Sequence, residues 1–245
     1  MTTAADAHAA MRGLPFTDVS GITAGRPVLV IAPHPDDEVI GCGGMILRSL
    51  AVGIAPAIAI VTDGSGSHPN SMKFPPLAVK ALRMQEARQA AAELGLPPDR
   101  LHFLDYRDSV APHDGPDFDR GVERLIGLAA QYDCRVICAP WRLDPHGDHL
   151  AVHKMAVRVA EALGVRHLSY PVWGWMLPGD QELGAVDISG SRLDIVDLLG
   201  RKRQALQAHA TQYAGIIDDD PTGFQLTDDI LNRFIQPFEV YLNNP

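Results

Sequence analysis

The sequence is poor in cysteine, and it has neither a long apolar run nor a run of like charges. Its three cysteines, Cys42, Cys134 and Cys138, are an odd number without the spacing of a disulfide framework, which argues against a disulfide-stapled secreted domain. No apolar stretch reaches the ~18 residues of a transmembrane helix, and the start of the chain lacks the basic residues and apolar run of a signal peptide. We therefore expect a soluble, cytoplasmic protein that has no membrane partner.

The charges are mixed along the chain and sum to −9, with no run of five like charges. A groove that follows nucleic-acid phosphates needs clustered basic residues, so nucleic acid is not expected as a partner. An acidic surface also repels anionic membranes. The 46% hydrophobic content of the 245 residues is that of a globular protein with a sizeable core, and it is compatible with a homo-oligomer.

Short apolar runs alternate with amphipathic stretches through most of the chain. The run PVLVIA at 27–32 is rich in β-branched residues and free of charge, as a buried strand is. Further strands are predicted at 57–61, 101–104, 135–139 and 167–170, and helices at 39–52, 78–94, 118–130 and 149–163. This order predicts a doubly wound, mostly parallel α/β sheet with helices on both faces, a Rossmann-like arrangement.

The two ends of the chain have weaker patterns. Residues 1–25 are rich in Ala, Gly and Thr, and we expect them to be a loose lead-in to a single domain over residues 26–245. Residues 171–184 contain Trp, Pro and Gly and predict a shaped loop. A helix is expected over 198–209, and another helix with a short strand over 227–241.

Ionisable side chains crowd the segment directly after the first predicted strand. His34, Asp36, Asp37 and Glu38 place four such groups within five positions. The first turn of a helix favours acidic residues, which accounts for Glu38 alone. Carboxylates this close repel one another unless a cation compensates them, and His and Asp are both zinc ligands. The segment therefore indicates a divalent metal.

A second group of ionisable residues follows the fourth predicted strand. It comprises His146, Asp148, His149 and His153, with Asp144 close by. Ligands of doubly wound sheets bind beyond the carboxyl ends of the strands, so we expect the two groups to form one metal site. A catalytic zinc takes three protein ligands and keeps one position open for water, and the two groups supply these ligands with residues to spare for proton transfer.

Taken together, these motifs resemble those of a known enzyme family. HPDDE at 34–38, GCGG at 41–44 and HGDH at 146–149 resemble the motifs of the PIG-L family of N-acetylglucosaminyl deacetylases, also called LmbE-like proteins. Further matches are TDG at 62–64, Arg83 and Glu86, Asp108, and HATQ at 209–212, in which Thr211 takes the place of the family's Ser. The resemblance covers about residues 27–213.

The resemblance implies a role for each residue of the two groups. It implies one Zn²⁺ per chain held by His34, Asp37 and His149, although two nitrogens and one oxygen also suit other divalent metals. Asp36 would be the general base. His146 would be the general acid or the group that stabilises the oxyanion.

The resemblance also extends to the surroundings of the metal. It implies that Arg83 and Asp108 bind the substrate, and that Asp144 or Asp148 orients a histidine through its second nitrogen. The implied substrate is a small N-acetylated sugar conjugate, from which the enzyme hydrolyses the acetyl group. An amidase for a larger N-acyl group or a thiol-conjugate amide would use the same chemistry. A sugar- or nucleotide-binding module without catalysis is the third alternative, and the intact Asp36 argues against it.

Two polar residues of the helices have a second interpretation. His153 lies four residues after His149 on the same helix face. The Glu that follows the first His of a metalloprotease pair is absent, so packing or support of a ligand is favoured for His153. Arg83 either binds substrate or pairs with Glu86 on its own helix.

Residues of the second half are also ambiguous. Trp173 and Trp175 either stack on a sugar ring or form a local core. Lys202 and His209 fall on a late helix, and we expect them on a charged outer face.

Overall fold

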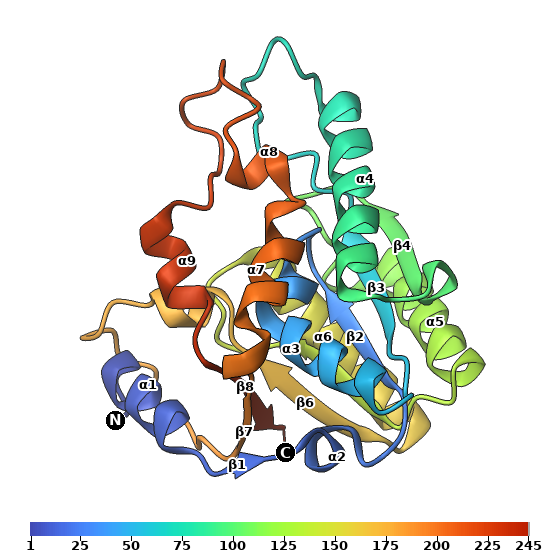
Figure 1. The fold of residues 1–245 in the computed structure, drawn as a ribbon, viewed down its shortest axis with the longest axis vertical. Coiled ribbons are helices and arrows are strands. Elements are labelled where there is room, and N and C mark those ends of the chain that lie inside the picture. The colour runs from blue at the N-terminus through green and yellow to red at the C-terminus, as the bar shows by residue number, and fades with distance from the viewer. Residues whose placement is uncertain (245) are drawn as a thin grey trace.

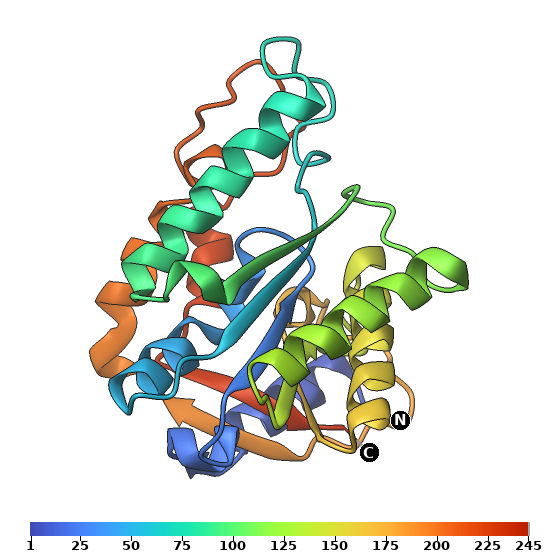
Figure 2. The ribbon, with the colours of Figure 1, turned by 90° about the vertical axis from the view of Figure 1, so that its right-hand side faces the viewer.

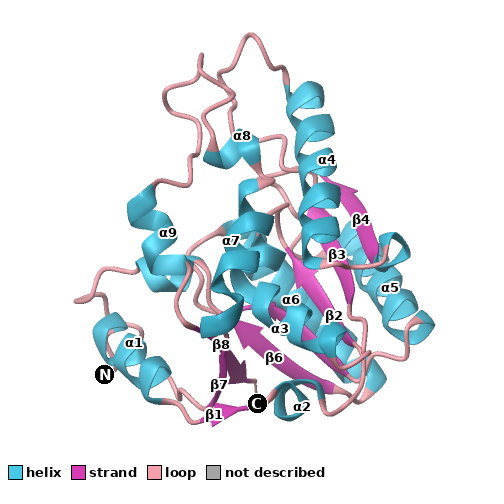
Figure 3. Ribbon diagram, in the orientation of Figure 1, coloured by secondary structure: helices cyan, strands magenta, loops and turns pink. Residues whose placement is uncertain are grey.

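Eight strands form one mostly parallel sheet in the computed structural model, which describes residues 1–244 (Figures 1 and 3). The strand order is β1-β7-β8-β6-β5-β2-β3-β4, and only β8 runs antiparallel to its neighbours in the described sheet. The doubly wound α/β fold expected from the sequence is confirmed. The strands are β1 Phe16–Thr17, β2 Val28–Ala32, β3 Ala57–Thr62, β4 Leu101–Tyr106, β5 Val136–Pro140, β6 Arg166–Tyr170, β7 Gly190–Asp194 and β8 Phe238–Asn243.

Helices cover both faces of this sheet. Figure 2, seen along the sheet, shows α3, α4 and α7 on one side and α5 and α6 on the other, and each layer has its own apolar core with the strands. Within residues 1–244 no helix has the length and apolar content needed to cross a membrane. The α-helices are α1 Ala4–Gly13, α2 Val19–Thr23, α3 Asp37–Ala51, α4 Pro76–Leu94, α5 Gly115–Gln131, α6 Gly147–Leu163, α7 Leu199–Gln207, α8 Ala210–Tyr213 and α9 Asp228–Phe234.

The point where the winding direction changes lies between β2 and β5. From β2 the chain runs outward to β3 and β4, and it then returns to β5 and continues outward to β6. Strands β2 and β5 are apolar and wholly buried because helices cover them on both faces. The crevice at such a switch point, beyond the carboxyl ends of the strands, is where doubly wound folds bind ligands.

Helix α3, the first helix of the layer that also contains α4 and α7, lies close to its neighbours because it contains glycines. A Cβ atom on Gly41 would lie 2.2 Å from the Tyr170 ring, and one on Gly44 would lie 2.4 Å from Ile195. Glycine at both positions therefore allows α3 to approach strand β6 and the segment after β7. This packing fixes the helix that begins at Asp37.

The expectation of a loose lead-in at 1–25 is wrong. Thr3 and Asp6 form a capping box that starts α1, and the two-residue strand β1 pairs with β7. The face of α1 that carries Ala7 and Met11 is fully buried in an apolar cluster with Trp175. The Ala-rich composition of this segment is thus that of a helix, for which Ala is the best former.

Two predictions for the later part of the chain are also wrong. Lys202 and His209 are 1% and 0% exposed, not part of an outer face. Lys202 Nζ donates to Glu239 Oε1 over 2.6 Å and to the carbonyl of Ile40 over 2.7 Å. Helix α7 lies on α3 and α4, so a side chain that would be solvated on an isolated helix meets a partner carboxylate inside the protein.

Candidate active site

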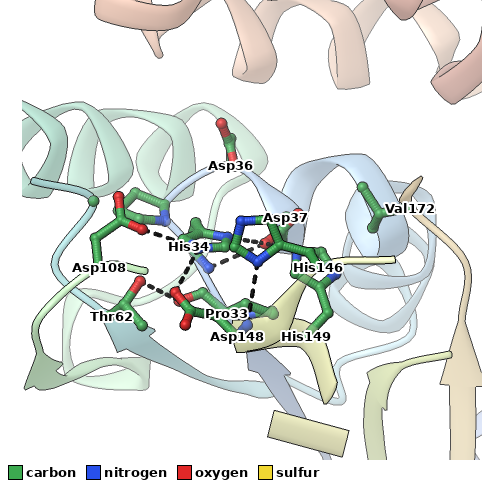
Figure 4. A network of polar contacts seen from close by, with 12 residues as sticks. Pro33, His34, Asp36, Asp37, Thr62, Asp108, His146, Asp148, His149 and Val172 are labelled. Carbon is green, nitrogen blue, oxygen red and sulfur yellow. Dashed lines mark hydrogen bonds and ion pairs between the residues drawn. The ribbon is translucent and has the colours of Figure 1, made fainter. Parts of the chain in front are cut away.

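Three loops bring the predicted site residues together at the carboxyl end of the sheet. His34, Asp36 and Asp37 follow β2, Asp108 follows β4, and the loop after β5 leads to His146, Asp148 and His149 (Figure 4). Apart from the half-buried His146, these side chains are buried. The structure therefore collects the two sequence motifs in one place.

Asp37 lies between two of the histidines. Its Oδ2 atom is 3.1 Å from His34 Nδ1 and 3.3 Å from His149 Nε2. The other ring nitrogen of His149, Nδ1, lies 3.0 Å from the Asp144 carboxylate, which orients the ring with Nε2 toward Asp37. His149 Nε2 is buried and has no hydrogen-bond partner of good geometry. An imidazole fixed in this way aims Nε2 at one point, and it presents a lone pair there to a metal ion that displaces the Nε2 proton.

Carboxylates also surround His34. Its Nε2 atom is 3.0 Å from Asp148 Oδ2 and 3.3 Å from Asp108 Oδ1. Asp148 is itself held by the backbone N–H groups of Ser109 and Ala111. Both nitrogens of His34 thus face acidic groups.

The charges of this cluster change the protonation of its members. Burial alone would lower the pKa of His149, but Asp37 and Asp144 raise it to about 9. Burial would raise the pKa of Asp37, but the positive charge of His149 at 3.3 Å and the contact with His34 hold it well below its usual range. The cluster therefore keeps a positive charge between its carboxylates, and a divalent cation can replace the protons there.

More groups are close enough for metal ligation than one ion needs. Ligand atoms of His34, His146 and His149 lie within 4.8 Å of one another, and so do those of His34, Asp108 and Asp148. Nitrogen and carboxylate oxygen are suitable ligands for zinc and for other divalent metals. The donor set thus fits a catalytic metal, with His34 common to both groups.

Asp36 has an unusual backbone conformation for a residue other than glycine, with φ of 128°. Arg83 holds its carboxylate over 3.0 Å, and Glu38 accepts a hydrogen bond from its backbone N–H. The Asp36 side chain makes no capping hydrogen bond to α3, so helix capping does not explain why an acidic residue stands at this position. Burial raises the pKa of Asp36 to about 6, although Arg83 opposes the shift. A positive φ at a residue other than glycine strains the backbone, and such strain is typical of functional sites.

His146 lies beside the cluster and lines a cavity of about 400 Å³. Its ring centre is 4.7 Å from that of His34. Its Nδ1 atom accepts a hydrogen bond from the backbone N–H of Asp148, so the proton of the neutral ring is on Nε2. Burial and the two neighbouring histidines lower the pKa of His146. The ring is therefore a neutral hydrogen-bond donor next to the other groups.

Arg83 and Asp108 line the same cavity. Arg83 does not pair with Glu86, as one interpretation of the sequence had it. Glu86 instead accepts hydrogen bonds from the N–H and the hydroxyl of Thr211, on the HATQ segment. The Asp108 carboxylate accepts the N–H of Gly66 over 2.9 Å. Both side chains stand beside Asp36 and His34, where polar groups of a ligand can reach them.

The remaining ambiguous residues separate clearly. His153 Nδ1 lies 3.0 Å from the carbonyl of Pro140, and its ring packs on that of His167, so it packs below the site. Trp175 belongs to the apolar cluster under α1, whereas Trp173 lines the cavity.

Three residues of the cavity wall were not predicted from the sequence. Ile40, Phe224 and Phe234 line the cavity together with Val172 and Trp173, which lie on the loop at 171–184. Their apolar side chains carry no motif, and the segments that bear them lie far apart in the sequence.

Comparison with known proteins agrees with these observations. The family model PIG-L, described as GlcNAc-PI de-N-acetylase, matches residues 29–160. The chain belongs to the PIG-L family. The matched part contains His34, Asp37 and His149, which supply the nitrogen and oxygen atoms described above. The family resemblance noted from the sequence is thereby confirmed.

Members of the PIG-L family and proteins of the same fold are similar over most of the chain. A 1D-myo-inositol 2-acetamido-2-deoxy-alpha-D-glucopyranoside deacetylase from Nocardia farcinica is 27% identical, over 88% of each chain. The structure of N,N'-diacetylchitobiose deacetylase from Pyrococcus horikoshii has a TM-score of 0.64 and 20% identity, covering 90% of this chain and 84% of that one.

The same fold also occurs in an enzyme of another class. The 4-carboxy-2-hydroxymuconate hydratase from Pseudomonas putida has a TM-score of 0.59 and 20% identity, over 76% of this chain and 80% of that one. The fold alone therefore does not define the reaction, which has to be argued from the site.

Proposed function

We propose that this PIG-L family protein is a zinc-dependent hydrolase that removes the acetyl group from an N-acetylated amino sugar of the N-acetylglucosamine type. The observation that supports it most directly is Asp37, shared between His34 and His149, with the buried Nε2 atom of His149 free. The deacetylase from Nocardia farcinica, which matches over most of both chains, supports the same reaction class.

His34, Asp37 and His149 would hold the metal in this proposal. Bound zinc would polarise the amide carbonyl and lower the pKa of a water molecule toward ~7. Asp144 positions His149 by accepting the hydrogen of its Nδ1. Asp148 would support His34 in the same way, because it contacts the opposite side of that ring from Asp37.

Asp36 would act as the general base. Its pKa of about 6 leaves it ionised at neutral pH, yet close enough to that pH to accept a proton efficiently. Arg83 fixes the orientation of the carboxylate. Water attacks the carbonyl carbon while Asp36 takes a proton from it, and the C–N bond then breaks to give acetate and the free amine.

His146 would stabilise the carbonyl oxygen as that oxygen gains negative charge. Its Nε2–H is the free donor of the ring, because Nδ1 accepts a hydrogen bond from the backbone. Negative charge beside the ring raises the pKa of His146 during the reaction, so the same residue can hold the proton that the departing amine requires. Arg83 and Asp108 would bind ring hydroxyls, for which they supply a donor and an acceptor.

We place this reaction in the cytoplasm, where thiols stay reduced, since Cys42, Cys134 and Cys138 are buried and unpaired. The test of the function is an assay of acetate release from a panel of N-acetylated sugars, using protein reconstituted with zinc. Turnover that disappears with a chelator and returns with zinc is the expected result. The proposed function would be disproved if none of the sugars in the panel released acetate.

A further inference from the structure

The cavity beside the site has two chemically different walls. Asp36, Arg83 and Asp108 line one of them. The other, which we call the apolar wall, consists of Ile40, Val172, Trp173, Phe224 and Phe234. In Figure 4, Asp108 and Val172 lie on opposite sides of the histidines. The histidines of the site therefore stand between a polar and an apolar surface.

The apolar wall is built from segments that are distant in the sequence but packed together. The Trp173 ring meets the Phe224 ring at 5.3 Å and the Phe234 ring at 5.5 Å, both edge to face. Ile40 lies one turn after Asp37 on α3. This packing gives a wall of defined shape with three aromatic rings.

The position of this wall is fixed relative to the metal-ligand candidates. The Asp144 carboxylate that holds His149 also accepts the backbone N–H groups of Val172, Trp173 and Gly174. A Cβ atom on Gly174 would lie 2.7 Å from this carboxylate, so the contact depends on glycine there. The wall and the ring of His149 are thus attached to one group.

The geometry of an amide decides which part of the substrate meets which wall. An N-acyl amino sugar has the sugar on the amide nitrogen and the acyl chain on the carbonyl carbon, and in the trans amide these two point in opposite directions. Sugar hydroxyls against an apolar surface would lose their hydrogen bonds, whereas Arg83 and Asp108 offer partners on the polar side. When the carbonyl is at the site, the acyl group therefore points toward the apolar wall.

The apolar wall is larger than an acetyl group requires. The acetyl group presents a single methyl, whereas the wall has five apolar side chains. We propose that the protein hydrolyses N-acyl amino sugars whose acyl chain is longer than acetyl, such as butanoyl and hexanoyl, in preference to the acetyl compound. This inference rests on the proposed amide hydrolysis. Water adds to the acyl carbon, the C–N bond breaks, and the products are a carboxylate and the protonated amine.

The test measures release of the free amine by the full-length, zinc-loaded protein from three methyl glycosides of glucosamine, acylated with acetyl, butanoyl or hexanoyl. Burial of a methylene group changes kcat/KM by about fourfold, so the butanoyl compound, with two more methylene groups, is expected to exceed the acetyl compound by roughly 15-fold. In Trp173→Ala and Phe224→Ala this ratio is expected to fall toward one. Phe16→Ala, which removes an exposed ring of β1 far from the cavity, is the matched control and should keep the ratio.

The outcomes separate this inference from the function on which it rests. Release of amine from the acetyl compound with equal or lower kcat/KM for the longer chains would overturn the inference and leave the proposed function intact. A second outcome would also overturn the inference. If a benzyl glycoside of N-acetylglucosamine had a higher kcat/KM than the methyl glycoside, and Trp173→Ala abolished this difference, the apolar wall would bind the aglycone and not the acyl chain. If no compound releases amine, both proposals fail. The wild-type series decides the question even if a variant does not fold.

Discussion

Two clusters of buried charge contact helix α3, and they differ in how completely their polar atoms are paired. Along the middle of the helix, Glu239 accepts hydrogen bonds from Lys202, Tyr241 and the N–H groups of Gly44 and Met45. At the beginning of the helix, the cluster of the candidate active site keeps buried atoms without a partner, among them His149 Nε2, Arg83 Nε and Glu38 Oε1 in the structure of residues 1–244.

This difference is the one expected between a cluster that stabilises the fold and a cluster that binds a ligand. A buried polar network is stable when every member is paired, and a partly paired one carries a cost in free energy. The cluster around Glu239 is closed in this sense. The site cluster retains unpaired atoms, which a metal ion and a substrate can pair, so burial of charge has two different purposes on one helix.

Removing a proposed metal ligand should have the largest effect, and it tests whether the site cluster differs from the cluster around Glu239 by binding a metal. In His149→Ala we expect loss of bound zinc and of all measurable turnover, because an imidazole that Asp144 orients cannot be replaced by solvent. Metal analysis after gel filtration measures the first and acetate release the second. His153→Ala, a substitution four residues later on the same helix, is the control and should keep its zinc. Full zinc occupancy in His149→Ala would show that the ion is bound elsewhere.

The second prediction separates the base from the ligands. Asp36→Asn is expected to retain zinc and to lose about 10² to 10⁴ in kcat, the usual effect of removing a general base. Asp114→Asn, at an exposed carboxylate directly before α5 that makes no cap hydrogen bond, should change neither. Loss of zinc from Asp36→Asn would make Asp36 a ligand instead of the base.

The closed cluster should respond in stability, not in chemistry. Lys202→Met leaves Glu239 buried without its counter-charge and is expected to lower the free energy of unfolding by about 3–5 kcal/mol. Urea denaturation monitored by circular dichroism measures this change. The exposed Lys154→Met is the matched control and should alter stability by no more than about 0.5 kcal/mol. Undiminished stability together with lost turnover would place Lys202 in the active site.

The smallest expected effect is the dependence of activity on pH. Burial raises the pKa of Asp36 to about 6 from the ordinary value of 3.8, and the positive charge of a bound metal lowers it again. A base works only when ionised, so kcat/KM should fall tenfold per pH unit below a pKa between 3.8 and 6. A pH profile in Asp36→Asn should lack this step. An acidic limb centred above pH 7 would point to a different base.

The sequence predicted the central part of the fold well. Strands β2, β3 and β5 are apolar runs whose burial on both faces is visible in their composition. The carboxyl ends of parallel strands meet at one edge of a sheet, so residues that follow β2 and β5 could be placed together without a structure.

Other features depend on contacts that a linear pattern does not contain. Strand β7 has the sequence GSRLD, and it forms because β8 and β1 pair with it on either side. Lys202 is buried because Glu239 lies across from it, 37 residues away in the chain. The contact of Asp148 with His34, 114 residues away, likewise depends on how the loops pack.

The double role of Asp144 has a consequence for how enzymes of this architecture diversify. One carboxylate ties the loop at 172–174 to His149, so an insertion or shift in this loop would displace a ring that we propose as a metal ligand. New specificities are then reached by exchanging side chains on a fixed frame, at Val172 and Trp173. The same holds for Phe224, because its backbone N–H donates to the carbonyl of Ser67, another residue of the cavity wall, over 2.8 Å. The side chains of the apolar wall, and not its backbone, are then the part of the pocket that is free to change.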